Sequence, residues 1–447
     1  MVQRDAGDRP PAQPLEFPSG SDALERDDGD EVLAESVSAT STLPSVPVDG
    51  RERALLVGVV LRASSRATVE AHLDELGQLV DTAGGVEVGR LVQERSSPDP
   101  ATFIGRGKVG ELADLVRAQG ARLVVFDDDL SGSQVRHLEE AMPEDVKVVD
   151  RAGVILDIFA LRARSREAQT QVEKAQLSYL VSRLTRRWVH LSRQAGGIGT
   201  RGVGETQLET DKRLIRKRIG VLAERLIEID RERTVQRSRR EAMPAVALVG
   251  YTNAGKSTLF ERLTGTRTLV EDRLFATLDA RVRRAELGDG LVATVADTVG
   301  FIRKLPHHLV ASFRSTLAEA ADAEIIVHLV DASHPEWRDH LRVGEEVLES
   351  LGVGREKCLV VLNKLDKLGE PVPAMADRPT VGISARRGDG LDLLRARLRD
   401  RVLALPGIEV LCFGPEGGAL LQRALALEVV LARKYSDDGI ELVVRRR

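Results

Sequence analysis

The sequence contains few cysteines and no long apolar run. Its two cysteines, Cys358 and Cys412, are too few for a disulfide framework or a cysteine-based metal site. No apolar run approaches the ~18 residues that a membrane-spanning helix needs, and the N-terminus lacks the basic-then-apolar pattern of a secretory signal. The sequence therefore predicts a cytoplasmic protein without a membrane span.

Charge is distributed unevenly along the chain. Residues 1–50 carry 11 acidic and 3 basic side chains, and residues 51–150 carry 18 acidic and 12 basic ones. Residues 151–240 instead carry 10 acidic and 21 basic side chains, a net charge of +11. Positive charge confined to one segment suggests that this segment holds a polyanion. A solvated helical face is the alternative interpretation of the same charges.

The N-terminal third divides into two parts. Residues 1–52 combine acids with proline, serine and glycine and have too little apolar area to fold, so a disordered acidic tail is predicted, with a tail that folds on binding as the alternative. Residues 53–150 alternate strands (54–61, 86–91, 123–126, 146–149) with helices (69–79, 108–119, and one capped by Ser131 and running to Met142). This alternation predicts a small α/β domain.

The rest of the chain divides into three parts. Residues 151–243 are predicted to form a helical hairpin, with helices over 167–193 and 205–240 and a tip loop at 196–204, where five of nine residues are glycine. Residues 244–406 return to α/β alternation. Residues 407–447, after the Pro406-Gly407 boundary, predict a small α+β domain with a helix over 419–434 and a strand over 440–444.

A phosphate-binding loop is predicted at residues 250–257. The apolar strand 245–249 is followed by GYTNAGKS, which matches G-x-x-x-x-G-K-[ST], and then by a helix over 257–263. Glycines let backbone N–H groups surround phosphates, and the helix N-terminus adds a positive dipole. In such a loop Lys256 reaches the β- and γ-phosphates, and the Ser257 hydroxyl binds Mg²⁺.

Two further motifs indicate guanine-nucleotide specificity. DTVG at 297–300 follows a strand over 291–296, which places Asp297 to hold Mg²⁺ and the Gly300 N–H to sense the γ-phosphate. NKLD at 363–366 follows a strand over 359–362, and the Asp366 carboxylate can accept the N1–H and N2–H₂ donors that guanine has and adenine lacks. Ser384 and Ala385, after the strand 380–383, are placed to support the base. The predicted ligands are GTP and Mg²⁺.

The candidate site residues follow from these motifs. Thr277, in FATLD at 275–279, is the candidate switch threonine that closes on Mg²⁺ and the γ-phosphate. Catalytic roles are assigned to Lys256, Thr277 and Gly300, and metal-binding roles to Ser257, Thr277 and Asp297. The nucleotide-binding set comprises Gly250, Tyr251, Thr252, Asn253, Ala254, Gly255, Lys256, Ser257, Thr258, Phe275, Thr277, Asp297, Gly300, Asn363, Lys364, Asp366, Ser384 and Ala385.

Two positions are unusual for a GTPase. Phe301 stands where many GTPases have a glutamine that orients the attacking water, so slow intrinsic hydrolysis stimulated by a partner is predicted. Asn253 resembles the asparagine of GTPases that recruit K⁺ as an additional positive charge. K⁺ is therefore a hypothetical further cofactor, and a hydrolysis rate unchanged by replacing K⁺ with Na⁺ would contradict it.

Several further stretches resemble the HflX family of translation-associated GTPases. They are TFIGRGK at 102–108, VFDD at 125–128, DRAGVILDIF at 150–159, QVEKAQL at 171–177 and GGIGTRGVGETQLET at 196–210, of which the last is the most specific. DTVGFI at 297–302 fits the same family, in which a hydrophobic residue at the position of Phe301 is typical. The resemblance covers about residues 53–406 and, more loosely, the C-terminal part. It implies a factor that binds the large (50S) ribosomal subunit and splits stalled or idle 70S ribosomes under stress.

The resemblance also implies an RNA contact for the hairpin. It places residues 198–203 of the tip loop against rRNA of the peptidyl-transferase region, and a glycine loop beside arginine-rich helices suits a narrow RNA cavity. Trp188 either stacks on a base or packs between helices. A monomer is expected. The candidate phosphate contacts are Arg183, Arg186, Arg187, Arg193 and Arg201.

Other functions remain open at this point. GTP could order the domains of a non-catalytic binding switch, or the protein could act in rRNA or tRNA maturation, although no modification chemistry is visible in the sequence. Some relatives are reported to use ATP or unwind RNA through the N-terminal domain. GRGK at 105–108 is too short for a second phosphate loop and lacks the following serine or threonine.

Overall fold

A computed structural model describes most of the chain after residue 50. The described residues are 51–62, 64–184, 207–238 (side chains 209–232), 243–266, 273–304, 319–368, 378–414, 418–436 and 439–446. They form three sheets with flanking helices, which confirms the predicted α/β class with a small C-terminal α+β part. Among them no helix is long and apolar enough to cross a membrane. Residues 1–50 of the predicted tail (1–52), the hairpin tip (196–204) and Arg186, Arg187, Trp188, Arg193 and Arg201 lie outside the described residues. The predicted tail is wrong at its end, because the first strand already begins at Glu52.

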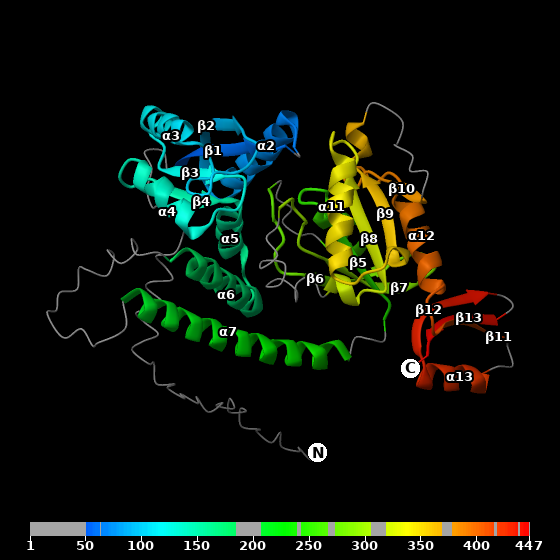
Figure 1. Ribbon diagram of the computed structural model, residues 1–447. Coiled ribbons are helices and arrows are strands. Elements are labelled where there is room, and N and C mark those ends of the chain that lie inside the picture. The colour runs from blue at the N-terminus through cyan, green and yellow to red at the C-terminus, as the bar shows by residue number, and fades with distance from the viewer. Residues whose placement is uncertain are drawn as a thin grey trace, which may run out of the picture. The chain divides into compact units, whose positions relative to one another are not determined.

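The first sheet is parallel, with the strand order β2-β1-β3-β4 (Figure 1). Alternate residues of β1 face its two sides: Leu56 packs with α2 and α5, whereas Leu55 and Val57 pack with α3 and α4. Helices therefore cover both faces, as parallel strands require. The bounds are β1 (Glu52–Val60), α2 (Arg66–Thr82), β2 (Gly85–Glu94), α3 (Arg106–Gln119), β3 (Leu123–Phe126), α4 (Gly132–Ala141), β4 (Lys147–Asp150) and α5 (Arg151–Arg162).

Two long helices follow α5 and lie side by side, α6 (Arg166–Arg183) and α7 (Gln207–Ser238) (Figure 1). Arg218 of α7 donates to Glu173 of α6 at 2.9 Å. The predicted helix over 167–193 is wrong at its end, because Leu184 has non-helical dihedrals (φ −59°, ψ 106°) and closes α6.

Arg183 was predicted to contact RNA phosphate, but its side chain makes its contacts within the protein. Its guanidinium donates to the Leu130 carbonyl at 2.9 Å, pairs with the Asp150 carboxylate, and lies 3.9 Å from the centre of the Tyr179 ring. Only 12% of the side chain is exposed. The structure therefore does not support Arg183 as a phosphate contact.

The second sheet has six strands in the order β10-β9-β8-β5-β7-β6, parallel except for β6. Ala247 and Val249 of β5 lie in one apolar cluster with Leu348 of α11, and Val246 and Leu248 pack with α8 and α12 on the other face. The bounds are β5 (Ala245–Gly250), α8 (Lys256–Thr264), β6 (Arg281–Glu286), β7 (Val292–Asp297), β8 (Ile325–Asp331), α11 (Trp337–Ser350), β9 (Cys358–Asn363), β10 (Thr380–Gly382) and α12 (Leu391–Leu403).

The C-terminal part corrects one prediction. The helix expected over 419–434 is only α13 (Gly418–Leu427), and Val429–Ser436 is a strand, β12. β12 and β11 (Ile408–Phe413) both pair antiparallel with β13 (Gly439–Arg445). Leucine, alanine, arginine and lysine in β12 are good helix formers, but pairing with β13 and burial of Leu431 and Ala432 decide for the strand.

Candidate guanine-nucleotide site

The predicted phosphate loop connects β5 to α8. Gly250 (φ 147°) and Gly255 (φ 96°) both have positive φ, which side chains rarely adopt. Lys256 Nζ donates to the carbonyls of Gly250 at 3.0 Å and Tyr251 at 2.8 Å, so this side chain lies over the loop. Burial lowers the pKa of Lys256 to about 8, against the opposing attraction of Asp297.

The three predicted magnesium ligands lie together. Ser257 Oγ donates to Asp297 Oδ2 at 2.8 Å, and Thr277 Oγ1 lies 3.2 Å from the same oxygen and 3.0 Å from Ser257 Oγ. Asp297 Oδ1 is buried and has no hydrogen-bond partner among the described residues, and burial raises the pKa of this carboxyl. Hard oxygen donors around a carboxylate with one unpartnered oxygen fit Mg²⁺.

The segment after Asp297 packs tightly on the phosphate loop. A Cβ on Gly300 would lie 2.8 Å from Thr252 Cγ2. The Phe301 N–H donates to the Gly250 carbonyl at 2.9 Å, and the Thr252 N–H donates to the Phe301 carbonyl at 2.7 Å. The Phe301 ring is 2% exposed and meets His328 edge to face. This side chain therefore points into the core and does not line the cavity.

Side-chain hydrogen bonds join the predicted guanine-binding motif at 363–366 to the phosphate loop and to the loop that carries Ser384 and Ala385. Asn363 Nδ2 donates to the Ala254 carbonyl at 2.8 Å, and Asn363 Oδ1 accepts the Ala385 N–H at 3.0 Å. The Ser384 hydroxyl donates to Asp366 Oδ1 at 2.6 Å and thereby lowers the pKa of this carboxyl. The Ser384 side chain thus contacts the Asp366 carboxylate and does not itself line the cavity.

A cavity of about 370 Å³ runs between these groups. Of the predicted residues, it is lined by Thr252, Asn253, Gly255, Lys256, Ser257, Thr258, Phe275, Thr277, Gly300, Asn363, Lys364, Asp366 and Ala385. It is not lined by Gly250, Tyr251, Ala254, Asp297 and Ser384. Sequence reasoning missed Arg273, Ala276, Thr298, Lys367 and Arg386, which line it as well. The only feature of the sequence that could have indicated them is their position: Arg273 lies two residues before Phe275, and each of the others lies directly beside a predicted site residue.

The Tyr251 side chain points away from the cavity. Its hydroxyl donates to Glu75 Oε2 at 2.5 Å and accepts the Arg303 backbone N–H at 2.8 Å. Its ring stacks on His340 with 3.8 Å between centroids. Burial, together with the Glu75 charge, raises the pKa of Tyr251. Any contact of Tyr251 with phosphate is therefore left to its backbone.

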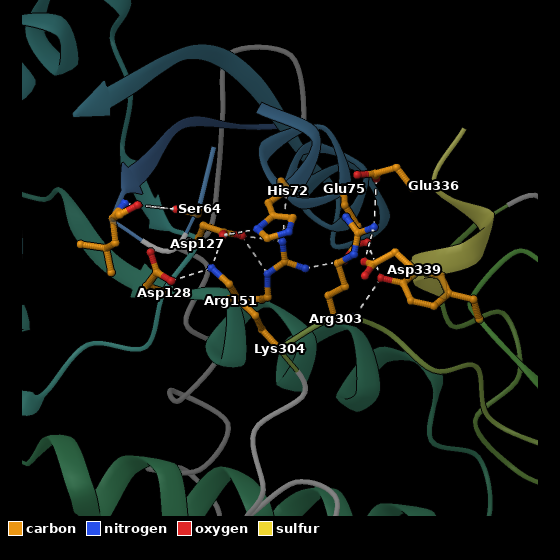
Figure 2. A network of polar contacts seen from close by, with 12 residues as sticks. Ser64, His72, Glu75, Asp127, Asp128, Arg151, Arg303, Lys304, Glu336 and Asp339 are labelled. Atoms are coloured by element: carbon orange, nitrogen blue, oxygen red, sulfur yellow. Dashed lines mark hydrogen bonds and ion pairs between the residues drawn. The ribbon is translucent and has the colours of Figure 1, made fainter. Parts of the chain in front are cut away.

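A buried ionic network joins the residues after DTVG to the first sheet (Figure 2). Lys304 Nζ lies 2.5 Å from both Asp127 Oδ2 and Asp128 Oδ1. Arg151 is 1% exposed and donates to Asp127 at 3.0 Å and to Glu75 at 2.5 Å. Burial alone would raise the pKa of Asp127, but the Arg151 charge, with Lys304, holds it well below its usual range.

A second cluster of possible metal ligands lies beside this network. His334, Glu336 and His340 offer ligand atoms within 4.8 Å of one another. However, Arg303 Nη2 donates to Glu336 at 3.0 Å and lies 2.8 Å from Asp339 (Figure 2). Burial lowers the pKa of His340 to about 3. Because the guanidinium already neutralises these carboxylates, we assign no metal to this cluster.

Comparisons with known proteins agree with this geometry. Three family models match in succession: GTP-binding GTPase N-terminal over residues 70–160, GTP-binding GTPase Middle Region over 162–240, and 50S ribosome-binding GTPase over 245–364. A GTPase HflX of Lacrimispora saccharolytica is 44% identical over 87% of this chain and 92% of that protein. The Caldanaerobacter subterraneus GTPase HflX is 47% identical over 77% and 79% of the two chains, and that of Escherichia coli is 41% identical over 89% and 94%.

Proposed function

Because this chain belongs to the HflX family of GTPases, we propose that it binds the large ribosomal subunit and splits stalled or idle 70S ribosomes under stress. It is a GTP-hydrolysing enzyme. The match of residues 245–364 to a 50S ribosome-binding GTPase model supports the ribosomal partner. The +11 charge of residues 151–240 supports an RNA contact in the hairpin, with the tip 196–204 as its centre. We further propose that the protein acts as a cytoplasmic monomer.

The observation that carries the site assignment is the group Ser257, Thr277 and Asp297 beside the buried Lys256. In our proposal the Lys256 ammonium group leaves the carbonyls of Gly250 and Tyr251 and donates instead to the β- and γ-phosphates of GTP. Ser257, Thr277 and Asp297 hold Mg²⁺, which when bound neutralises charge on the phosphoryl oxygens. The Gly300 N–H senses the γ-phosphate.

Selectivity for guanine is proposed for the other end of the cavity. The Asp366 carboxylate, oriented by the Ser384 hydroxyl, accepts the N–H donors of the base. Asn363 keeps the loop that carries Ala385 in register with the phosphate loop. Asn253, which lines the cavity with φ 60°, is the proposed K⁺ contact.

Stimulation by the ribosome is proposed because the usual water-orienting glutamine is replaced. The Phe301 ring is packed against His328 in the core and cannot orient a water molecule. The chain alone should therefore hydrolyse GTP slowly, and contact with the 50S subunit should complete the catalytic arrangement.

The experiment compares GTP turnover of the protein alone and with 50S subunits, for wild type and for a deletion of residues 197–203. We expect strong stimulation by 50S in the wild type and a large loss of it in the deletion, in K⁺ buffer more than in Na⁺ buffer. If 50S subunits change nothing while another RNA stimulates turnover, the maturation alternative replaces the ribosomal one. Splitting of 70S ribosomes that a non-hydrolysable analogue supports equally well would make the splitting step a binding switch.

A further inference from the structure

Asp279 connects the candidate switch segment to the first helix of the hairpin. It lies two residues after Thr277, and its Oδ2 accepts the backbone N–H groups of Arg164 and Ser165, both at 3.1 Å. The Ser165 hydroxyl donates to Asp279 Oδ1. Ser165 is the N-cap of α6, since its Oγ accepts the Ala168 N–H at 3.1 Å. Asp279 thus completes the N-terminus of α6, where the helix dipole also favours a negative charge.

A second contact holds the residues before Thr277. The Phe275 ring meets the Phe159 ring of α5 edge to face, with 4.7 Å between centroids and 80° between planes. Both rings are buried in one apolar cluster that also contains Leu278. Residues on both sides of Thr277 are therefore packed against the junction of α5 and α6.

Thr277 cannot move far without affecting these contacts. Its hydroxyl lies beside Ser257 and Asp297 in the same structure that has Asp279 bound to α6. Two residues of extended chain span at most about 7 Å. A switch threonine that leaves the metal site after hydrolysis would therefore pull Asp279 away from Ser165.

We propose that Asp279 is a positioning residue that couples closure of Thr277 on the nucleotide to the placement of α6, and thereby to the hairpin. This proposal rests on the proposed roles of Thr277 and of the hairpin tip. Coupling between two sites is reciprocal. Engagement of the hairpin by RNA therefore favours the closed Thr277, and the closed Thr277 favours RNA binding.

The test uses the full chain with Asp279→Ala and Asp279→Asn. The matched control is Ser131→Ala, because Ser131 caps α4 with the same kind of bond, accepting the Gln134 N–H at 3.2 Å. Affinities for a non-hydrolysable GTP analogue and for GDP are measured with Mg²⁺, as is 50S-stimulated turnover. Asp279→Ala should lower the analogue-to-GDP affinity ratio on the order of tenfold and reduce the stimulation. Asp279→Asn should lower it less, because its amide oxygen still accepts an N–H, and Ser131→Ala should leave it unchanged.

The outcomes separate this proposal from the function on which it rests. If Asp279→Ala keeps the ratio of the Ser131→Ala control, Asp279 only caps a helix and the coupling is refuted. If Asp279→Ala does not fold, the same ratio in Asp279→Asn and Ser165→Ala decides the matter. If the wild type is not stimulated by 50S subunits, the ribosomal proposal fails, whereas the nucleotide ratio still supports or overturns the role of Asp279.

Discussion

Replacing Gly300 by alanine should weaken binding of GTP far more than binding of GDP. The new Cβ would lie 2.8 Å from Thr252 Cγ2, 2.9 Å from Thr252 Cα and 3.0 Å from Lys256 Nζ. Ordinary carbon–carbon contacts are about 3.5–4.0 Å, so the segment must move by roughly 0.7 Å or more. Such overpacking costs about 1–3 kcal/mol. The cost applies when the Gly300 N–H must face the γ-phosphate, whereas with GDP the segment is free to move away.

The expected result is a loss of roughly 5- to 150-fold in affinity for a non-hydrolysable GTP analogue. Titration of fluorescent analogue and fluorescent GDP measures both affinities on one preparation. Gly110→Ala is the matched control, because no atom lies within 4 Å of a Cβ at that position of α3. An unchanged analogue-to-GDP ratio in Gly300→Ala would refute the assignment of Gly300 as the γ-phosphate contact.

Three further predictions concern the buried charges and the base. Arg151→Met should lower the free energy of unfolding by about 3–5 kcal/mol, because it leaves Asp127 buried without its main partner. Denaturant unfolding measures this change. The control is Arg117→Met, which removes an exposed ion pair and should lower the free energy of unfolding by only about 0–1 kcal/mol. Burial raises the pKa of Glu52 to about 7 from 4.5, so the folded state loses stability as the pH rises through this interval. Glu52→Gln should therefore add about 3 kcal/mol at pH 8 and nothing at pH 4. Asp366→Asn should shift preference from GTP towards xanthosine triphosphate in competition binding, because an amide can donate to the oxygen at purine C2.

Each of these predictions can fail clearly. Equal unfolding curves for Arg151→Met and Arg117→Met would show that the network in Figure 2 carries no net stability. A gain from Glu52→Gln that is the same at both pH values would mean that the Glu52 carboxyl is not the titrating group. An unchanged base preference in Asp366→Asn would remove Asp366 from the proposed recognition of guanine.

Local chemistry made much of the fold and site predictable. The phosphate loop depends on glycines at positive φ between a strand and a helix. Because these residues are adjacent in the sequence, the motif can be recognised without the structure. The apolar runs of the first sheet gave strands at the expected places, with β3 at 123–126 as predicted. The N-cap at Ser131 was readable because a cap and the N–H that it accepts are three residues apart, and the structure adds the reciprocal bond from Gln134.

Contacts between distant residues decided the rest. The sequence by itself determined the α/β class and the motifs that predict a GTP site, because each depends on neighbours along the chain. Only the tertiary structure turned Tyr251 towards Glu75, buried Arg183 against Asp150 and brought Asp279 to the N-terminus of α6. It also made Val429–Ser436 a strand, because residues that suit a helix became more stable when paired with β13. Partners that lie tens or hundreds of residues apart leave no periodic signal, so their contacts appear only when the chain is folded.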